Sequence, residues 1–363
     1  MSKLSQDSIL KILPNQLSEN ILNNGLREVY LSSNLSKNWF KATLNDKQLM
    51  MRTWITFSDL NNNEFNKFMN ISKEYRNMTI FCLKDCESEV YLNLIKKFSS
   101  SIVTLHVKHL FLNNNNQDVE GIILPNLINL NMEFVSQNVT KMFMATNPRV
   151  KSLSLKYSSS CNEMIKFFND NQELLILEIS DQIFKDMFEN YIENQFTFKL
   201  QKFMLTECHT DLQLNNFARF LKTQNELHTI GLNAKETETI KFIFEQVSIK
   251  RLLISFDAND CSSLNDTILI ENIFIFELEL DTVQQVPLDI LKVFLKALPK
   301  LKILHINFIS NEMVKFVAEN MKEMKFITFN RIIVNENSIA YYKTLKKMNS
   351  GINQNIEFYF KHL

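Results

Sequence analysis

One short apolar pattern recurs along most of the chain. It is complete between Leu200 and Cys208, where apolar residues take the first, fourth and sixth positions and a cysteine takes the ninth. Successive first positions are 22 to 27 residues apart, which indicates one structural unit used many times. The first positions are Met78, Ile102, Leu127, Val150, Leu174, Leu200, Leu227, Ile249, Ile275, Leu301 and Met324.

This spacing is typical of leucine-rich repeats, in which each copy supplies one strand and usually one helix. We therefore predict an α/β fold over residues 51–363: a leucine-rich-repeat solenoid, or horseshoe, with parallel strands on its concave face and helices on its convex face. About 11 clear repeats are expected, with degenerate copies near Ile55 and Ile356 closing the two ends. Helices are predicted at 64–72, 89–98, 163–168, 182–192, 212–221, 236–244, 288–298, 312–321 and 338–348.

Composition excludes several classes of function. The chain has 40 basic and 40 acidic residues, which disfavours a general attraction to nucleic acid or to an anionic membrane, and we predict neither as a partner. Its four glycines are widely separated, so neither a P-loop nor a dinucleotide-binding loop is possible. We find no signal peptide and no uncharged run long enough to cross a bilayer. The five cysteines are an odd number, which favours reduced thiols in the cytoplasm or nucleus.

No group of residues suggests catalysis. Of the six histidines, His106 and His305 are expected on the concave face, but nothing in the sequence places a nucleophile or carboxylate beside either, so we predict no catalytic residue and no enzyme activity. The pairs Cys82/Cys86 and Cys208/His209 are better explained as loop residues than as zinc ligands, because a closed zinc site needs four ligands. We therefore predict no metal and no cofactor.

The strand residues between the buried apolar positions are predicted to form a binding surface for an unknown protein target. In a parallel repeat sheet these residues line the concave face. The face grades from basic to acidic along the chain, a pattern that could bind a dipolar partner, although a merely solvated strand face is an equal alternative. The candidate target-binding residues are Lys84, His106, Lys108, Glu277, Glu279 and Asp281, with Asn131, Ser154, Glu178, Met204 and Leu253 between them.

Residues 7–50 do not follow the repeat and have the spacing of several short helices. They contain Leu13-Pro14, an Ile21-Leu22 pair eight residues on, and the ending Leu35-Ser-Lys-Asn-Trp39. This segment resembles an F-box, although Asn15 and Gln16 replace the acidic residue that often follows Leu-Pro and the middle is shortened around Gly25. The resemblance implies adaptor-binding residues, which would be Leu13, Pro14, Leu17, Ile21, Leu22, Leu35 and Trp39.

The whole chain therefore resembles F-box/leucine-rich-repeat proteins. That resemblance implies a non-catalytic substrate-recognition subunit of an SCF-type (Skp1-cullin-F-box) ubiquitin ligase, in which the F-box binds a Skp1-like adaptor and the cullin complex while the repeats bind the target. The alternative is a stand-alone repeat scaffold or inhibitor without a ubiquitin role. In that case residues 7–50 would only cap the first repeat.

Overall fold

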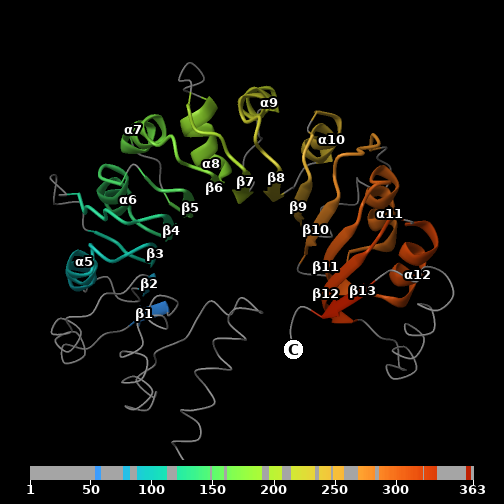
Figure 1. The fold of residues 1–363 in the computed structure, drawn as a ribbon, viewed down its shortest axis with the longest axis horizontal. Helices are drawn as coiled ribbons and strands as arrows, with labels where there is room; N and C mark the ends of the chain where they lie inside the picture. Colours follow the sequence, from blue (N-terminus) through green and yellow to red (C-terminus); the bar gives the residue numbers. More distant parts are fainter. Residues whose placement is uncertain are drawn as a thin grey trace, which may run out of the picture. The chain divides into compact units, whose positions relative to one another are not determined.

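The computed structural model describes residues 54–58, 77–81, 88–112, 121–147, 149–158, 162–189, 196–206, 214–233, 237–246, 248–256, 269–282, 286–321, 323–332 and 357–360 (Figure 1). The chain forms two compact units. Unit 1 is Met1–Leu174 with Gln195–Phe198, and unit 2 is Leu175–Asn194 with Lys199–Leu363. The predicted boundary between residues 50 and 51, and the adaptor-binding residues of 7–50, lie outside the described residues.

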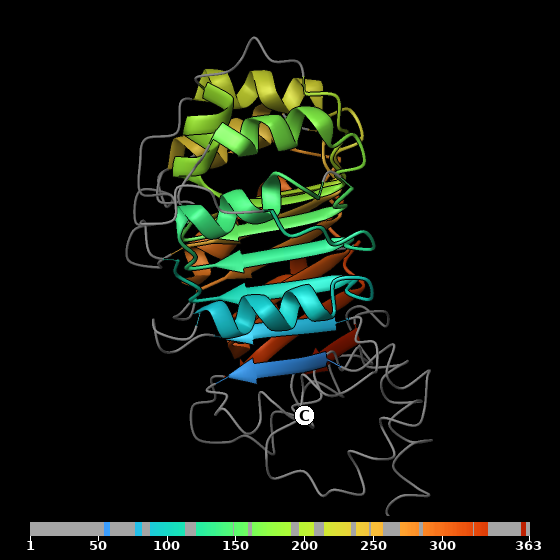
Figure 2. The ribbon, with the colours of Figure 1, turned by 90° about the vertical axis from the view of Figure 1, so that its left-hand side faces the viewer.

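Unit 1 is a parallel sheet with helices on one face. Its strands are β1 (Trp54–Ser58), β2 (Asn77–Phe81), β3 (Thr104–Lys108), β4 (Asn129–Glu133) and β5 (Ser152–Lys156), which lie side by side in chain order. Every neighbouring pair is parallel. The helices are α5 (Ser88–Lys97), α6 (Gln137–Met144) and α7 (Asn162–Asp170). Figure 2 shows the strands of unit 1 running in one direction with α5 against them.

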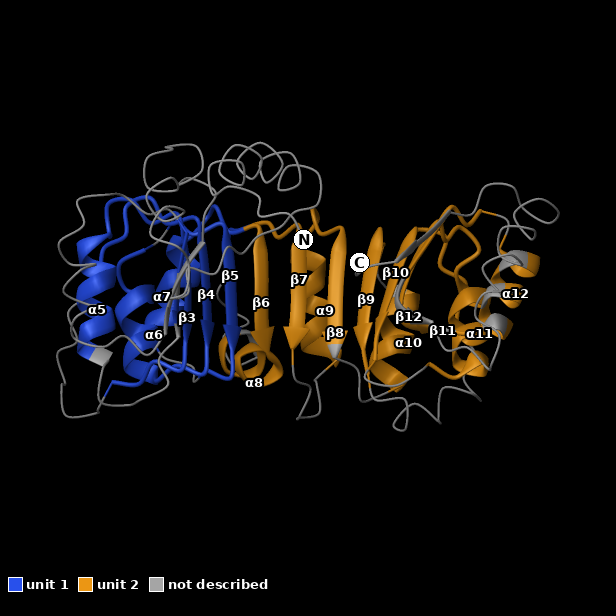
Figure 3. Cartoon of the chain, turned by 90° about the horizontal axis from the view of Figure 1, so that it is seen from below, with its two compact units in different colours: residues 1–174, 195–198 blue, residues 175–194, 199–363 orange. Residues whose placement is uncertain are grey.

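Unit 2 continues the same alternation. Its parallel strands are β6 (Ile176–Ser180), β7 (Lys202–Thr206), β8 (Thr229–Asn233), β9 (Arg251–Ser255), β10 (Glu277–Asp281), β11 (Ile303–Ile309), β12 (Phe326–Ile332) and β13 (Glu357–Phe360), in chain order. The helices are α8 (Asp181–Phe184), a π-helical turn η2 (Lys185–Glu189), α9 (Leu214–Thr223), α10 (Thr237–Gln246), α11 (Leu288–Ala297) and α12 (Asn311–Asn320). Figure 3 colours the two units separately.

The alternation of apolar and polar residues along each strand decides which face meets the helices. Leu105 and Val107 of β3 are fully buried, as are Leu153 and Leu155 of β5, whereas the residues on either side point to the opposite face. Each fully buried Leu or Ile side chain contributes about 1.5–3 kcal/mol through its removal from water. An all-parallel α/β repeat fold is therefore the observed architecture.

The fourth and sixth positions of the pattern are confirmed as the aligned strand positions in ten copies, from the one that starts at Ile102 to the one that starts at Met324, and both are buried in the first nine of these. The first copy was predicted as Met78, Phe81 and Leu83, and this frame is wrong. The register aligns Met78 with Leu105 and Ile80 with Val107, so Met78 is a fourth position. The run from Asn77 to Leu83 is almost continuously apolar. The sequence therefore does not show which of the two alternating sets of residues in this strand faces the helices.

The predicted end of the array also needs a correction. Ile356 and Phe358 were expected at the two buried strand positions, but the register of β13 aligns Phe358 with Ile327 and Phe360 with Phe329. The fourth and sixth positions of this copy are therefore Phe358 and Phe360. Both corrections concern the first or last copies, where the pattern departs most from the consensus spacing.

Most predicted helices are confirmed within one or two residues. Two differ: α6 was not predicted, and the single helix expected at 182–192 is a four-residue α-helix followed by the π-helical turn η2. The predicted helices at 64–72 and 338–348 lie outside the described residues. Among the helices that the structure describes, none is long and apolar enough to cross a membrane.

Buried amide side chains form hydrogen bonds with backbone groups 21 to 25 residues earlier in the chain. Asn147 is 4% exposed, and its side chain donates to Ile122 O at 2.9 Å and accepts from Leu124 N at 2.8 Å. Asn171 donates to Val150 O at 2.7 Å, and Gln224 accepts from Leu200 N at 2.9 Å. These side chains satisfy backbone groups that would otherwise be buried without partners between strand and helix layers.

Phenylalanine rings fill the space between sheet and helices. In unit 2 the rings of Phe184, Phe203, Phe217 and Phe220 pack around one another, with centroids 5.1–6.1 Å apart. Such edge-to-face and tilted pairs add about 0.5–1.5 kcal/mol each beyond area burial. The large rings suit a layer that has few glycines and few small residues.

Candidate functional site

The helix-free side of the strands is the candidate site, and we call it the open face. It is the strand face opposite the one that packs on the described helices. Parallel pairing without offsets places the open-face residues of neighbouring strands in rows. Each row therefore collects side chains from residues about 25 positions apart in the chain.

The open face of unit 1 is polar across β3, β4 and β5. Asn129 donates to Thr104 Oγ1 at 3.1 Å, and Lys108 Nζ lies 2.9 Å from Glu133 Oε2. Lys108 and Lys156 are positive, Glu133 is negative and His106 is counted as neutral, so the open-face residues of these strands have a net charge of +1. We call this surface the polar grid; its three rows are Thr104, Asn129 and Ser152; His106, Asn131 and Ser154; and Lys108, Glu133 and Lys156.

Two neighbouring atoms in the middle row of the polar grid make no hydrogen bond. Asn131 Oδ1 and Ser154 Oγ are both buried and both lack a partner. Asn131 and Ser154 are register partners on β4 and β5, and Ser154 is 8% exposed. A buried polar atom without a partner costs about 1–3 kcal/mol, so two adjacent ones are unusual.

A row of stacked rings follows the strand ends of unit 1. His109, Phe134 and Tyr157 each come directly after a strand, with φ of 54°, 52° and 52°. The His109 and Phe134 rings are 4.9 Å apart, and the Phe134 and Tyr157 rings are 4.0 Å apart and almost parallel. Left-handed backbone costs a non-glycine residue about 1–2 kcal/mol, which the stacking contacts partly offset. Tyr157 remains 49% exposed.

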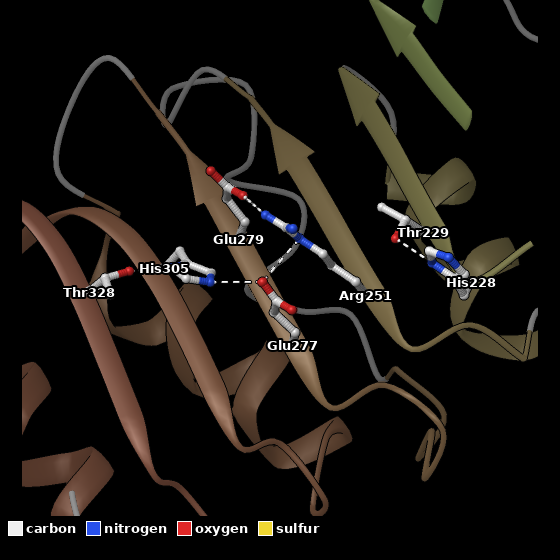
Figure 4. Close-up of polar contacts among 7 residues, drawn as sticks. All are labelled: His228, Thr229, Arg251, Glu277, Glu279, His305 and Thr328. Carbon is white, nitrogen blue, oxygen red and sulfur yellow. Dashed lines mark hydrogen bonds and ion pairs between the residues drawn. The ribbon is translucent and has the colours of Figure 1, made fainter. Parts of the chain in front are cut away.

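The open face of unit 2 carries a charge network centred on β10 (Figure 4). Arg251 lies opposite Glu277 in the register and reaches two carboxylates, with Nε 3.1 Å from Glu277 Oε1 and a terminal nitrogen 2.8 Å from Glu279 Oε2. The guanidinium is partly exposed, at 38% of its side chain, so solvent screens these contacts. Arg251 therefore holds the two glutamates in fixed positions rather than leaving them extended into solvent.

His305 extends the network onto β11 and β12. Its Nε2 lies 2.9 Å from Glu277 Oε1, and its Nδ1 bonds the hydroxyl of Thr328, its register partner. Beyond it, Asn307 donates to Asp281 Oδ1 at 2.6 Å. With one arginine against three carboxylates, and His305 neutral, the network has a net charge of −2. Most of its charged groups already have partners within the protein.

The middle row of the same face lacks polar side chains from β7 to β9, where it consists of Met204, Gly231 and Leu253. Gly231 is a register partner of Met204 and Leu253, and a Cβ added at Gly231 would meet Met204 Sδ at 2.2 Å. The thioether of Met204 therefore lies over Gly231, where any side chain would displace it. The middle row of unit 2 thus changes from apolar at Leu253 of β9 to charged at Glu279 of β10.

The predicted target-binding residues are distributed over both units. His106 and Lys108 belong to the open face of unit 1, and Glu277, Glu279 and Asp281 form one strand of unit 2. Lys84 lies outside the described residues, and the corrected register gives its expected place beside Lys108 to Phe81. Sequence analysis missed Arg251 and the special role of Ser154, because an arginine at a strand start and a serine between leucines carry no signal of their own.

Comparison of the sequence with models of known protein families finds no match, and comparison with curated proteins finds no significant relative. The repeat geometry and the residues of the open faces are therefore the observations that indicate a function. No group of three or more His, Cys, Asp or Glu side chains able to hold a metal ion occurs within the described part of the chain.

Proposed function

We propose that this chain is a non-catalytic protein-recognition subunit that binds a protein target on the open faces of its leucine-rich repeats. The observation that carries the proposal is the unbroken parallel register within each unit, which places polar and charged side chains in rows while the helices occupy the other face. Flat rows of outward-pointing side chains on a rigid scaffold suit the recognition of another protein.

We further propose that residues 7–50 form an F-box that binds a Skp1-like adaptor, so that the chain serves as the substrate receptor of an SCF-type ubiquitin ligase. The support is the resemblance carried by Leu13-Pro14, Ile21-Leu22 and Trp39, placed directly before the repeats. In this role the chain makes and breaks no bond. Its contribution is to hold a target lysine near the ubiquitin carrier, which raises the local concentration of the reacting groups.

The proposed place of action is the cytoplasm or nucleus, where ubiquitin ligases of this type work. The odd number of cysteines supports a reducing compartment. Neither a cofactor nor a metal is part of the proposed mechanism, because adaptor and target contacts alone account for a receptor.

Adaptor binding by the full-length protein tests the finer proposal. Immobilised Skp1 should retain the wild-type chain, and Trp39→Ala should weaken retention about 30-fold or more, because large buried aromatics dominate such interfaces. Asn38→Ala is the matched control, since the variable position of the Ser-Lys-x-Trp ending should tolerate alanine. If wild type and Trp39→Ala are both folded and neither binds Skp1, the chain is better described as a stand-alone repeat scaffold or inhibitor.

A further inference from the structure

We propose that Asn131 and Ser154 form a specificity site that reads a side-chain carboxamide, an Asn or Gln, on the bound protein target. This inference depends on the proposed function and names what unit 1 recognises. The two side chains are register partners on adjacent strands of the open face, and the buried Oδ1 and Oγ atoms have no hydrogen-bond partner. Ser154 is 8% exposed, yet nothing in the described structure accepts or donates a bond at its hydroxyl.

The chemistry of the two atoms selects a neutral amide. Asn131 Oδ1 can only accept a hydrogen bond, whereas the Ser154 hydroxyl can donate one. A carboxamide supplies the complementary pair, since its NH2 group donates and its carbonyl accepts. Adjacent strands are about 4.8 Å apart, so one carboxamide can contact both residues.

The alternatives fit less well. A carboxylate has no donor for Asn131 Oδ1 and would place oxygen against oxygen. An ammonium group could donate to both atoms, but the polar grid has a net charge of +1, which disfavours a cation at its centre. A backbone amide of the target cannot reach the middle row easily, because Lys108 and Glu133 stand in the next row as a 2.9 Å ion pair. A carboxamide on a flexible stem can reach between them.

The unmade bonds make this pair different from its neighbours. In the row before it, Asn129 already donates to Thr104, and in the row after it the ion pair is complete. Asn131 is half-buried, and the terminal torsion of asparagine is soft, so a small rotation can present its Oδ1 to an incoming group. Binding would therefore complete two hydrogen bonds that folding leaves open.

Selection from a displayed library of random 12-residue peptides, with the full-length protein as bait, tests the inference. Enriched peptides should share an Asn or Gln at one position, and a synthetic copy should bind about tenfold more weakly to Ser154→Ala, as expected for the loss of one hydrogen bond. Asn131→Leu should weaken binding at least as much. Asn169→Ala, an exposed residue of α7 on the helix side of unit 1, is the control and should bind like wild type.

Changes in the peptide complete the test. Replacing its Asn or Gln by Asp, Glu or Lys should reduce binding as strongly as Ser154→Ala does. Equal binding of the charged peptides, or unchanged binding to Ser154→Ala and Asn131→Leu, would overturn the inference while leaving the proposed target-binding role intact. A library that yields no binder to the folded protein would count against both, and retention of Skp1 would still report separately on the adaptor-binding segment.

Discussion

The open faces of the two units differ in a way that reverses the usual expectation about binding surfaces. Unit 2 has the denser charge, but Arg251 bridges two glutamates and His305 bonds the first of them. Unit 1 has fewer charges, and its middle row contains two neutral polar atoms without partners. The more available hydrogen-bonding capacity is therefore found where the charge is lower, since a charge that is already paired offers a partner little.

The same comparison separates positioning from recognition. The charge network holds side chains of β9, β10 and β11 against one another. The polar grid leaves Asn131 and Ser154 unsatisfied at a cost in stability. Residues whose arrangement lowers the stability of the folded protein are candidates for function, because a bound partner can supply the hydrogen bonds that they lack.

The largest effect is expected on the helix side, where both units use the same device. Asn147→Leu should destabilise the protein by about 2–3 kcal/mol, because Leu124 N loses its buried acceptor and Ile122 O and Phe143 O each lose a donor. Gln224→Leu in unit 2 should cost less, about 1–2 kcal/mol, because it leaves one such group, Leu200 N. Urea unfolding measures both, with the exposed Asn169→Leu of α7 as control. Equal costs would contradict the predicted difference between the two amides. No cost from either substitution would show that the buried amides do not stabilise the protein.

A smaller effect is expected from opening the charge network of unit 2. Arg251→Leu leaves Glu277 and Glu279 without their shared cation and should cost about 1 kcal/mol, the upper range for a partly exposed ion pair. The cost should shrink at high salt, because salt screens both the lost attraction and the remaining repulsion. Urea unfolding at low and high salt measures it, and the neighbouring exposed Lys250→Leu should show neither effect. A salt-independent cost would indicate lost packing by the arginine stem instead.

The sequence alone predicts much of the fold and less of the site. Ten copies of the pattern give the correct strand register, and nine of them give two buried positions, because period-2 burial on one face of a strand is strongly specified. The first copy fails at Met78, where a nearly continuous apolar run fits two parities. The open-face membership of His106 and Glu279 is predictable from the same alternation.

Contacts on the open face could not be predicted. Which carboxylates Arg251 contacts depends on side-chain rotamers on neighbouring strands. The left-handed backbone of Phe134 could not be predicted either, because the position is neither glycine nor asparagine, the residues that usually adopt this conformation. The unmade bonds of Ser154 are a property of its neighbours rather than of its own residue type. Local pattern thus determines the scaffold, whereas the chemistry of the surface depends on pairs of residues about 25 positions apart.

The smallest effect is the sharpest test of the comparison. Ser154 in unit 1 and Ser180 in unit 2 are buried to the same degree, at 8% and 5% exposed, but only Ser180 uses its hydroxyl, accepting from Ile183 N at the start of α8. Ser180→Ala should therefore cost about 1 kcal/mol, as expected for a lost helix cap. Ser154→Ala should change the free energy of unfolding by less than about 0.5 kcal/mol or raise it, because no bond is lost and an unsatisfied group is removed. Urea unfolding of the two variants in parallel measures both changes. If Ser154→Ala lowers the free energy of unfolding as much as Ser180→Ala does, the Ser154 hydroxyl already makes a hydrogen bond in the folded protein and is not available to a partner.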